Sequence, residues 1–123
     1  KVYFDTFSNY FEISGESRPE NVQDFYMPIM SWINEFNNHM IETRKLGEPI
    51  KPLNINIKLE YFNSSSAKYI LDLLKAFKEI HDNGFEMTIN WHYEDGDEDM
   101  LEAGQEMSKM LKYDFNYIQI KPK

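Results

Sequence analysis

Two stretches of the chain alternate strictly between apolar and polar residues, which is the pattern of a half-buried β-strand. The apolar positions of the first are Leu53, Ile55, Ile57, Leu59 and Tyr61. The second stretch, residues 85–93, alternates in the same way. Two shorter strands around a polar turn are expected in residues 2–14, and a last strand in residues 115–120. A strand buried on both faces would be apolar throughout, so one face of the sheet should be covered and the other open.

Apolar residues recur at helical spacing in three further stretches. The first predicts a helix over residues 19–40, which begins at a proline in the favoured first position and is kinked at Pro28. The second predicts a helix that starts in the polar residues 63–66 and ends at Gly84, a residue suited to a left-handed position. The third helix follows the acidic residues 94–99, whose carboxylates oppose the dipole at its start.

The predicted order is therefore β-β-α-β-α-β-α-β. Strands that alternate with helices predict parallel pairing through right-handed crossovers, and the first two strands form a hairpin. We expect one α/β domain over residues 1–123, with a mixed sheet and helices on one face only. The sequence contains no internal repeat.

Composition narrows the functions that this fold could carry. The formal net charge is −8, so nucleic acid and anionic membranes are poor partners. The chain has no cysteine, which excludes disulfides, thiol catalysis and cysteine-based zinc sites. No apolar run is long enough to span a bilayer and no signal-peptide pattern is present, so we expect a soluble, cytoplasmic protein without a cofactor.

Asn63, Ser64, Ser65 and Ser66 form the most informative motif, because they follow a predicted strand directly and open a predicted helix. A helix N-terminus favours anions, and a phosphoryl group on a serine adds about −1.5 to −2 charges there. Serine is also a preferred helix cap, and on the motif alone a cap is the better explanation.

The acidic residues 94–99 should lie at the same sheet edge, because both segments follow the carboxyl ends of strands. Asp95, Asp97, Asp99 and Glu106 have the spacing of a calcium loop, but Met100 occupies the position that requires glycine. A triad of Ser64, His92 and an acidic-loop carboxylate is conceivable, although the sequence lacks a nucleophile-elbow motif. A histidine on the solvated sheet face is the simpler reading of His92.

Three motifs in order resemble the SiaC family of bacterial regulatory phosphoproteins. They are Ile13-Ser14-Gly15-Glu16-Ser17-Arg18-Pro19-Glu20, then Leu59-Glu60-Tyr61-Phe62-Asn63-Ser64-Ser65-Ser66-Ala67-Lys68, and then Trp91-His92-Tyr93-Glu94 with Asp97-Glu98-Asp99-Met100-Leu101-Glu102-Ala103-Gly104. The resemblance covers nearly the whole chain. It implies a fold similar to STAS domains and anti-sigma factor antagonists.

The resemblance also implies a function. A partner kinase phosphorylates a hydroxyl residue, a phosphatase reverses this, and the unphosphorylated protein binds and activates a diguanylate cyclase that promotes biofilm. The family's threonine falls on Ser64, with Ser65 and Ser66 as alternates. The implied partner surface comprises Asn63, Ser64, Ser65, Lys68, His92, Glu94, Asp95 and Asp97. No catalytic residue is implied.

Two other interpretations remain open from the sequence. A small hydrolase would use Ser64 and His92, and an unmodified docking module would use the polar sheet face around Asn54, Asn56 and Asn90. For the switch, we expect a phosphate on Ser64 to repel the acidic residues 94–99 and any acidic partner surface.

Overall fold

The computed structural model describes residues 2–17, 22–62 and 64–121, which form a five-stranded sheet and three helices. In chain order the elements are β1 (Val2–Asp5), β2 (Tyr10–Ser17), α1 (Val22–Lys45), β3 (Leu53–Phe62), α2 (Ser64–Asp82), β4 (Met87–Glu94), α3 (Glu98–Leu111) and β5 (Asn116–Ile120). This order confirms the prediction from the hydrophobic pattern.

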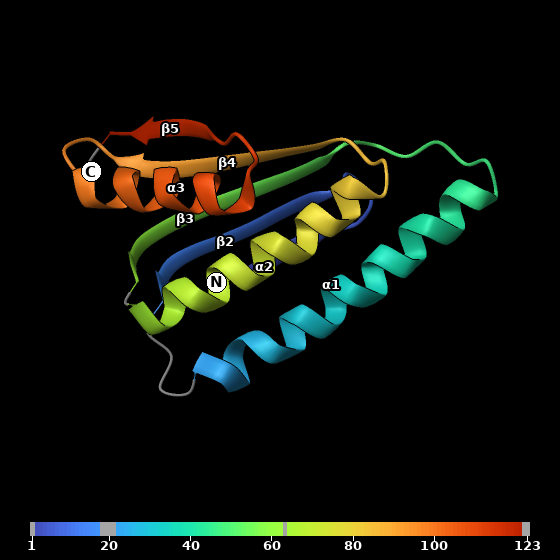
Figure 1. The fold of residues 1–123 in the computed structure, drawn as a ribbon, viewed down its shortest axis with the longest axis horizontal. Helices are drawn as coiled ribbons and strands as arrows, with labels where there is room; N and C mark the ends of the chain where they lie inside the picture. Colours follow the sequence, from blue (N-terminus) through green and yellow to red (C-terminus); the bar gives the residue numbers. More distant parts are fainter. Residues whose placement is uncertain (1, 18–21, 63, 122–123) are drawn as a thin grey trace.

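The strands lie in the sheet in chain order, β1-β2-β3-β4-β5. β1 pairs antiparallel with β2, and the three remaining pairs are parallel. Each parallel pair is joined by one helix, and right-handed crossovers that always advance in the same direction put every helix on the same face. In Figure 1 the helices α2 and α3 accordingly cross in front of the strands, and β5 forms the upper border.

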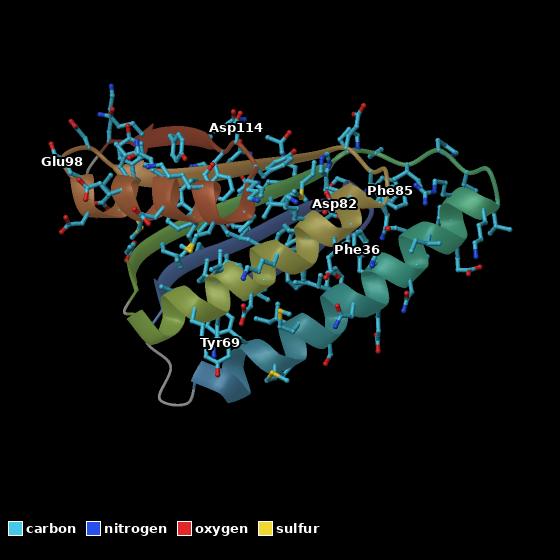
Figure 2. The ribbon with its side chains drawn as sticks, in the orientation of Figure 1. Phe36, Tyr69, Asp82, Phe85, Glu98 and Asp114 are labelled. Atoms are coloured by element: carbon cyan, nitrogen blue, oxygen red, sulfur yellow. The ribbon has the colours of Figure 1, made fainter. Side chains whose placement is uncertain are left out.

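The core lies between the helices and the covered face of the sheet. The alternating residues of β3 are nearly inaccessible, from Leu53 at 0% to Leu59 at 6% exposure. The ring of Phe11 contacts Phe36 and Phe77, with centroids 5.2 and 5.1 Å apart, and so joins β2 to α1 and α2. Figure 2 shows Phe36 on α1 turned toward α2.

Several predicted boundaries were wrong by a few residues. Helix α1 does not end at residue 40 but continues to Lys45. The continuation is stabilised by Arg44, which lies over the Phe85 ring at 4.5 Å and donates to the carbonyl of Asn83. Strand β4 begins at Met87 and not at residue 85, although Phe85 is buried in the core. Pro28 lies inside α1, and the predicted start at Pro19 falls outside the described residues.

Two turns follow the expected chemistry. Gly84 has φ +102° directly after α2, and its N–H donates to the carbonyl of His81 at 2.9 Å, as expected for a helix that ends at glycine. The turn before β2 contains Asn9 at φ +56°, whose side-chain amide donates to the Lys51 carbonyl at 2.7 Å. Asn9 is 6% exposed, so this amide anchors the hairpin to the segment before β3.

Candidate regulatory and docking site

The parallel strands β2 to β5 all end at one edge of the sheet, where the sequence places its candidate residues. Helix α2 begins at Ser64, two residues after the last residue of β3, and the acidic loop follows β4. Asn63 and the side chains of Ser64, Ser65 and Ser66 lie outside what the structure describes. The shared edge of the helix start and the acidic loop therefore agrees with the sequence expectation (Figure 1).

Hydrogen bonds to α3 and to β5 hold the acidic loop in place. The carboxylate of Asp97 accepts from the N–H of Met100 at 3.1 Å and caps α3. Gly96 takes φ +89°, and the N–H of Asp95 donates to the carbonyl of Ile120 at 2.9 Å, which ties the loop to β5. Glu98 and Asp99 occupy the first turn, where the helix dipole favours negative charge (Figure 2 labels Glu98). Asp97 is thus a structural cap, and the described residues contain no cluster suited to a metal ion.

Trp91 fixes α3 against β4. Its indole is fully buried, and its Nε1 donates to the carbonyl of Met100 at 2.9 Å. Gly104, one turn further along α3, lies against the same ring. Successive residues of a strand point to opposite faces, so His92 lies on the open face of the sheet, away from the helices.

Strands β3 and β4 separate at this edge. Their pairing ends at Ile57 and Trp91, although β3 continues to Phe62 and β4 to Glu94. The outer pairs persist, because Ser17 still pairs with Phe62 and Glu94 still pairs with Ile120. Figure 1 shows β3 bending away from β4 toward the start of α2.

A cleft of about 650 Å³ lies at this separation. It is lined by Ser14, Gly15, Lys58, Leu59, Glu60, His92, Tyr93, Glu94, Ile120 and Lys121. Glu60 and Glu94 are exposed, and neither forms an ion pair with another described residue. The cleft is therefore a carboxylate-rimmed depression of the size that ligands and partner side chains occupy.

On the open face of the sheet, His92 contacts a row of hydrogen-bonded asparagine side chains, which we call the asparagine ladder. Asn56, Asn90 and Asn116 are register partners on β3, β4 and β5, and their side-chain amides bond to one another at 3.2 Å. Asn54 extends the ladder, accepting from Asn56 at 3.0 Å and from Asn90 at 2.9 Å. Nε2 of His92 lies 3.2 Å from Oδ1 of Asn56. Since an amide oxygen only accepts, this contact assigns the proton to Nε2.

The environment of His92 favours its neutral form. Burial, and then the positive charge of Lys58, hold the pKa of His92 below its ordinary value of 6.5. Lys58 is itself paired with Glu12 at 3.1 Å, and the hydroxyl of Tyr10 donates to the same carboxylate oxygen at 2.7 Å. The hydrogen bond from Tyr10 lowers the pKa of Glu12, and the hydrogen bond with Glu12 raises the pKa of Lys58.

The structure brings together some of the sequence-predicted residues and separates others. His92 and Glu94 line the cleft, and Asp95 and Asp97 form the adjoining loop. Lys68 lies on α2, on the covered side of the sheet, with its Nζ 5.9 Å from the centre of the Tyr69 ring. His92 lies on the open face of the sheet and α2 on the covered face. The Ser64 side chain lies outside what the structure describes, so the triad with Ser64 stays a hypothesis.

Sequence reasoning missed Tyr10 and Glu12 and treated Asn56 as solvent-exposed, whereas Asn56 is 5% exposed. The polar alternation correctly put Asn56 on the open face, but neighbouring asparagines cover it. Only the strand register, which pairs Glu12 with Asn56 and Asn56 with Asn90, could have revealed the cluster.

Comparison with known proteins identifies the class. Residues 1–120 match the model of the SiaC family of regulatory phosphoproteins, and the chain belongs to this family. An uncharacterized protein of Pseudomonas aeruginosa (strain UCBPP-PA14), PA14_02130, is 27% identical over 103 residues, which are 84% of this chain and 75% of that protein.

Solved structures share the fold. A chain in the crystal structure of the diguanylate cyclase SiaD with its activator SiaC from Pseudomonas aeruginosa has a TM-score of 0.76 and 23% identity, over 98% of this chain and 90% of that one. A second structure of SiaC from that organism has a TM-score of 0.73 and 22% identity, over 98% and 88% of the two chains.

None of the helices in the described residues combines the length and the apolar character that a membrane span requires.

Proposed function

We propose that this chain is a phosphorylation-controlled activator of a diguanylate cyclase, which it binds in its unphosphorylated form. The observation that carries the proposal is the junction of β3 and α2. In a chain of the SiaC family, this junction puts a serine-rich helix start at the edge that also holds the cleft and the acidic loop. The proposed docking surface comprises Asn63, Ser64, Ser65, Lys68, His92, Glu94, Asp95 and Asp97.

Helical spacing favours Ser64 over its neighbours as the phosphate acceptor. Positions four apart share a helix face, so position 64 lies on the face of Lys68, and position 66 lies on the face of Ile70. Lys68 is exposed, whereas Ile70 is fully buried. A kinase needs access to the hydroxyl, and a phosphate needs solvent or a cation. From this spacing we propose Ser64 as the acceptor, with Ser65 as the first alternate and Ser66 as the second.

The switch that we propose is electrostatic. A phosphate on Ser64 adds about two negative charges at a helix start, where the dipole and Lys68 tolerate it. The phosphate also increases the negative charge of a sheet edge that already carries Glu94, Asp95 and Asp97. The edge then repels an acidic partner surface, and docking weakens without unfolding the domain.

This proposal requires a cognate kinase and phosphatase, and it assigns no catalysis to the chain itself. Its family is regulatory, and His92 donates to Asn56 on the sheet face opposite α2. Both the kinase and the cyclase use nucleotides, so the proposal includes a cytoplasmic location.

Mass spectrometry of the protein from its native cell, with and without the cognate kinase, tests the modification. We expect a single phosphate on Ser64 and its absence from Ser64→Ala. Serines that stay unmodified with active kinase would reject the switch and leave them as helix caps.

Cyclase binding and cyclic di-GMP synthesis test the consequence. Ser64→Ala should bind and activate the cyclase like the unmodified chain, while phospho-Ser64 and Ser64→Asp should do neither. Ser31→Asp is the matched control, because it adds the same charge at an exposed position on α1. Equal affinity of Ser64→Asp, phospho-Ser64 and unmodified protein would refute the electrostatic mechanism.

A further inference from the structure

Strand β5 leaves one long edge of the sheet without a partner among the described residues. It pairs with β4 on one side, and the sheet order ends with it. All five of its residues are exposed, including Tyr117 at 37%, Ile118 at 39% and Ile120 at 39%. In Figure 1 no helix covers the outer side of β5.

Sheet edges are normally protected against pairing by charges, proline, bulges or a covering segment. The sequence of β5, Asn116-Tyr117-Ile118-Gln119-Ile120, contains no charge, proline or glycine. The opposite edge differs. β1 has only four residues, Phe4 stacks on Trp32 of α1 with centroids 4.3 Å apart, and Asp5 closes the strand by accepting from the N–H of Phe7 at 3.0 Å. The unprotected edge is therefore β5.

We propose that β5 is a self-association edge, at which a second copy of this chain adds its own β5 in the antiparallel direction. In this arrangement the two-fold axis is perpendicular to the sheet. The helix-covered faces of both copies therefore lie on the same side of the joined sheet. The full strand overlaps when Ile118 lies opposite Ile118 of the second copy. Asn116 then faces Ile120 and Tyr117 faces Gln119, so each copy's unpaired backbone groups meet those of the other.

Two charged residues that flank β5 favour a second copy in the antiparallel direction. Asp114 precedes β5 and Lys121 follows it, and both are exposed (Figure 2 labels Asp114). Antiparallel pairing brings Asp114 of one copy toward Lys121 of the other, whereas parallel pairing would place the two acidic loops, which join β5 at Ile120, side by side. The pairing segment is thus neutral and self-complementary, although the chain carries a net charge of −8.

The arrangement also leaves the proposed docking edge free. The acidic loop joins β5 at Ile120, through the N–H of Asp95. In an antiparallel pair the two acidic loops lie at opposite ends of the joined strands, and their attachment points at Ile120 are about 13 Å apart along the strands. Their repulsion is small at that distance, and each copy presents its cleft separately.

Light scattering and sedimentation of the full chain over a range of concentrations test the association. We expect a dimer, which Ile118→Lys converts to a monomer while circular dichroism remains unchanged. Met110→Lys is the matched control, because it makes the same change at a position on α3 that is 54% exposed, and it should remain a dimer. A monomer at every concentration would overturn the proposal, and so would a dimer that Ile118→Lys leaves intact.

Cysteine cross-linking tests the register, since the natural chain has no cysteine. Directly opposed Cα atoms lie about 4.5–5.5 Å apart, within disulfide range. Ile118→Cys should therefore form a covalent dimer on mild oxidation. Asn116→Cys alone should not, because its copies would lie about 13 Å apart along the strands, but it should cross-link when mixed with Ile120→Cys. The reverse pattern would overturn the assigned register. A monomer whose Ile118→Lys variant loses cyclase binding would show that the edge serves the cyclase instead.

Discussion

The Cα of Gly104 lies so close to the indole of Trp91 that a Cβ added to Gly104 would stand 2.5 Å from Cδ1. Carbon atoms at that distance overlap, and the obstacle is a fully buried ring. The contact allows α3 to lie directly on β4, where the Trp91 Nε1 also donates to the Met100 carbonyl. The contact between Gly104 and Trp91 therefore fixes α3 on β4. It also positions the acidic loop, which connects these two elements.

Gly104→Ala should consequently destabilise the protein, although alanine is the better helix former. The helix gains about 1 kcal/mol from the substitution, while overpacking costs about 1–3 kcal/mol. We expect a net loss of up to about 2 kcal/mol in the free energy of unfolding by denaturant. Gln105→Ala, at the exposed neighbouring position, should change it by less than about 0.5 kcal/mol. A Gly104→Ala protein more stable than the parent would contradict this contact.

Asp97→Ala should cost about 1 kcal/mol of stability, because it removes the carboxylate that accepts from the N–H of Met100. Asp97→Asn keeps an acceptor of the same shape and should retain most of that stability. Comparison of the two in denaturant unfolding separates the cap from the charge. If Asn destabilises as much as Ala, the negative charge at the helix start matters more than the hydrogen bond.

The hydrophobic pattern predicted the order of helices and strands along the chain, the parallel pairing and the covered face, because each follows from local periodicity and the handedness of crossovers. Element ends were less predictable. The helix α1 reaches Lys45 through contacts of Arg44 with Asn83 and Phe85, which are about 40 residues away in the chain. No local pattern contains such a contact.

The candidate site divides in the same way. The serine-rich helix start and the acidic loop follow strands and begin helices, so sequence position alone located them. The cleft was not predictable, because it depends on where β3 and β4 stop pairing, at Ile57 and Trp91. The asparagine ladder required the register of three strands.

The stability of the protein should depend on His92 in mildly acidic solution. The pKa of His92 is lowered in the fold, so the folded state favours the neutral ring and the unfolded state binds the proton more readily. Its contribution is complete above about pH 6.5, the ordinary pKa of histidine, and is lost as the pH falls from there through the lower folded pKa. His92→Gln should therefore show a smaller loss of stability over that interval in pH-dependent unfolding.

The charge of Lys58 contributes to that lowered pKa, and its removal gives a direct test. Lys58→Met takes away the positive charge and leaves Glu12 unpaired, so both effects should raise the pKa of His92. Titration of the His92 ring protons by NMR measures the shift. An unchanged or lower pKa in Lys58→Met would mean that Lys58 does not act on the imidazole.

Arg44 should hold the end of α1 to the turn before β4. Its guanidinium lies 4.5 Å from the centre of the Phe85 ring and donates to the Asn83 carbonyl, so it combines a cation–π contact with a hydrogen bond. Arg44→Ala should cost about 1–2 kcal/mol of unfolding free energy, since each contact contributes about 0.5–1 kcal/mol. Arg44→Lys keeps the charge but loses the planar fork, and should recover only part of the loss. Lys45→Ala, at the next and exposed position, is the control and should be nearly neutral.

Amide hydrogen exchange adds a local readout, because Arg44→Ala should speed exchange in the last turn of α1 while β3 stays protected. Equal stability of Arg44→Ala and Lys45→Ala would show that α1 reaches Lys45 without this contact.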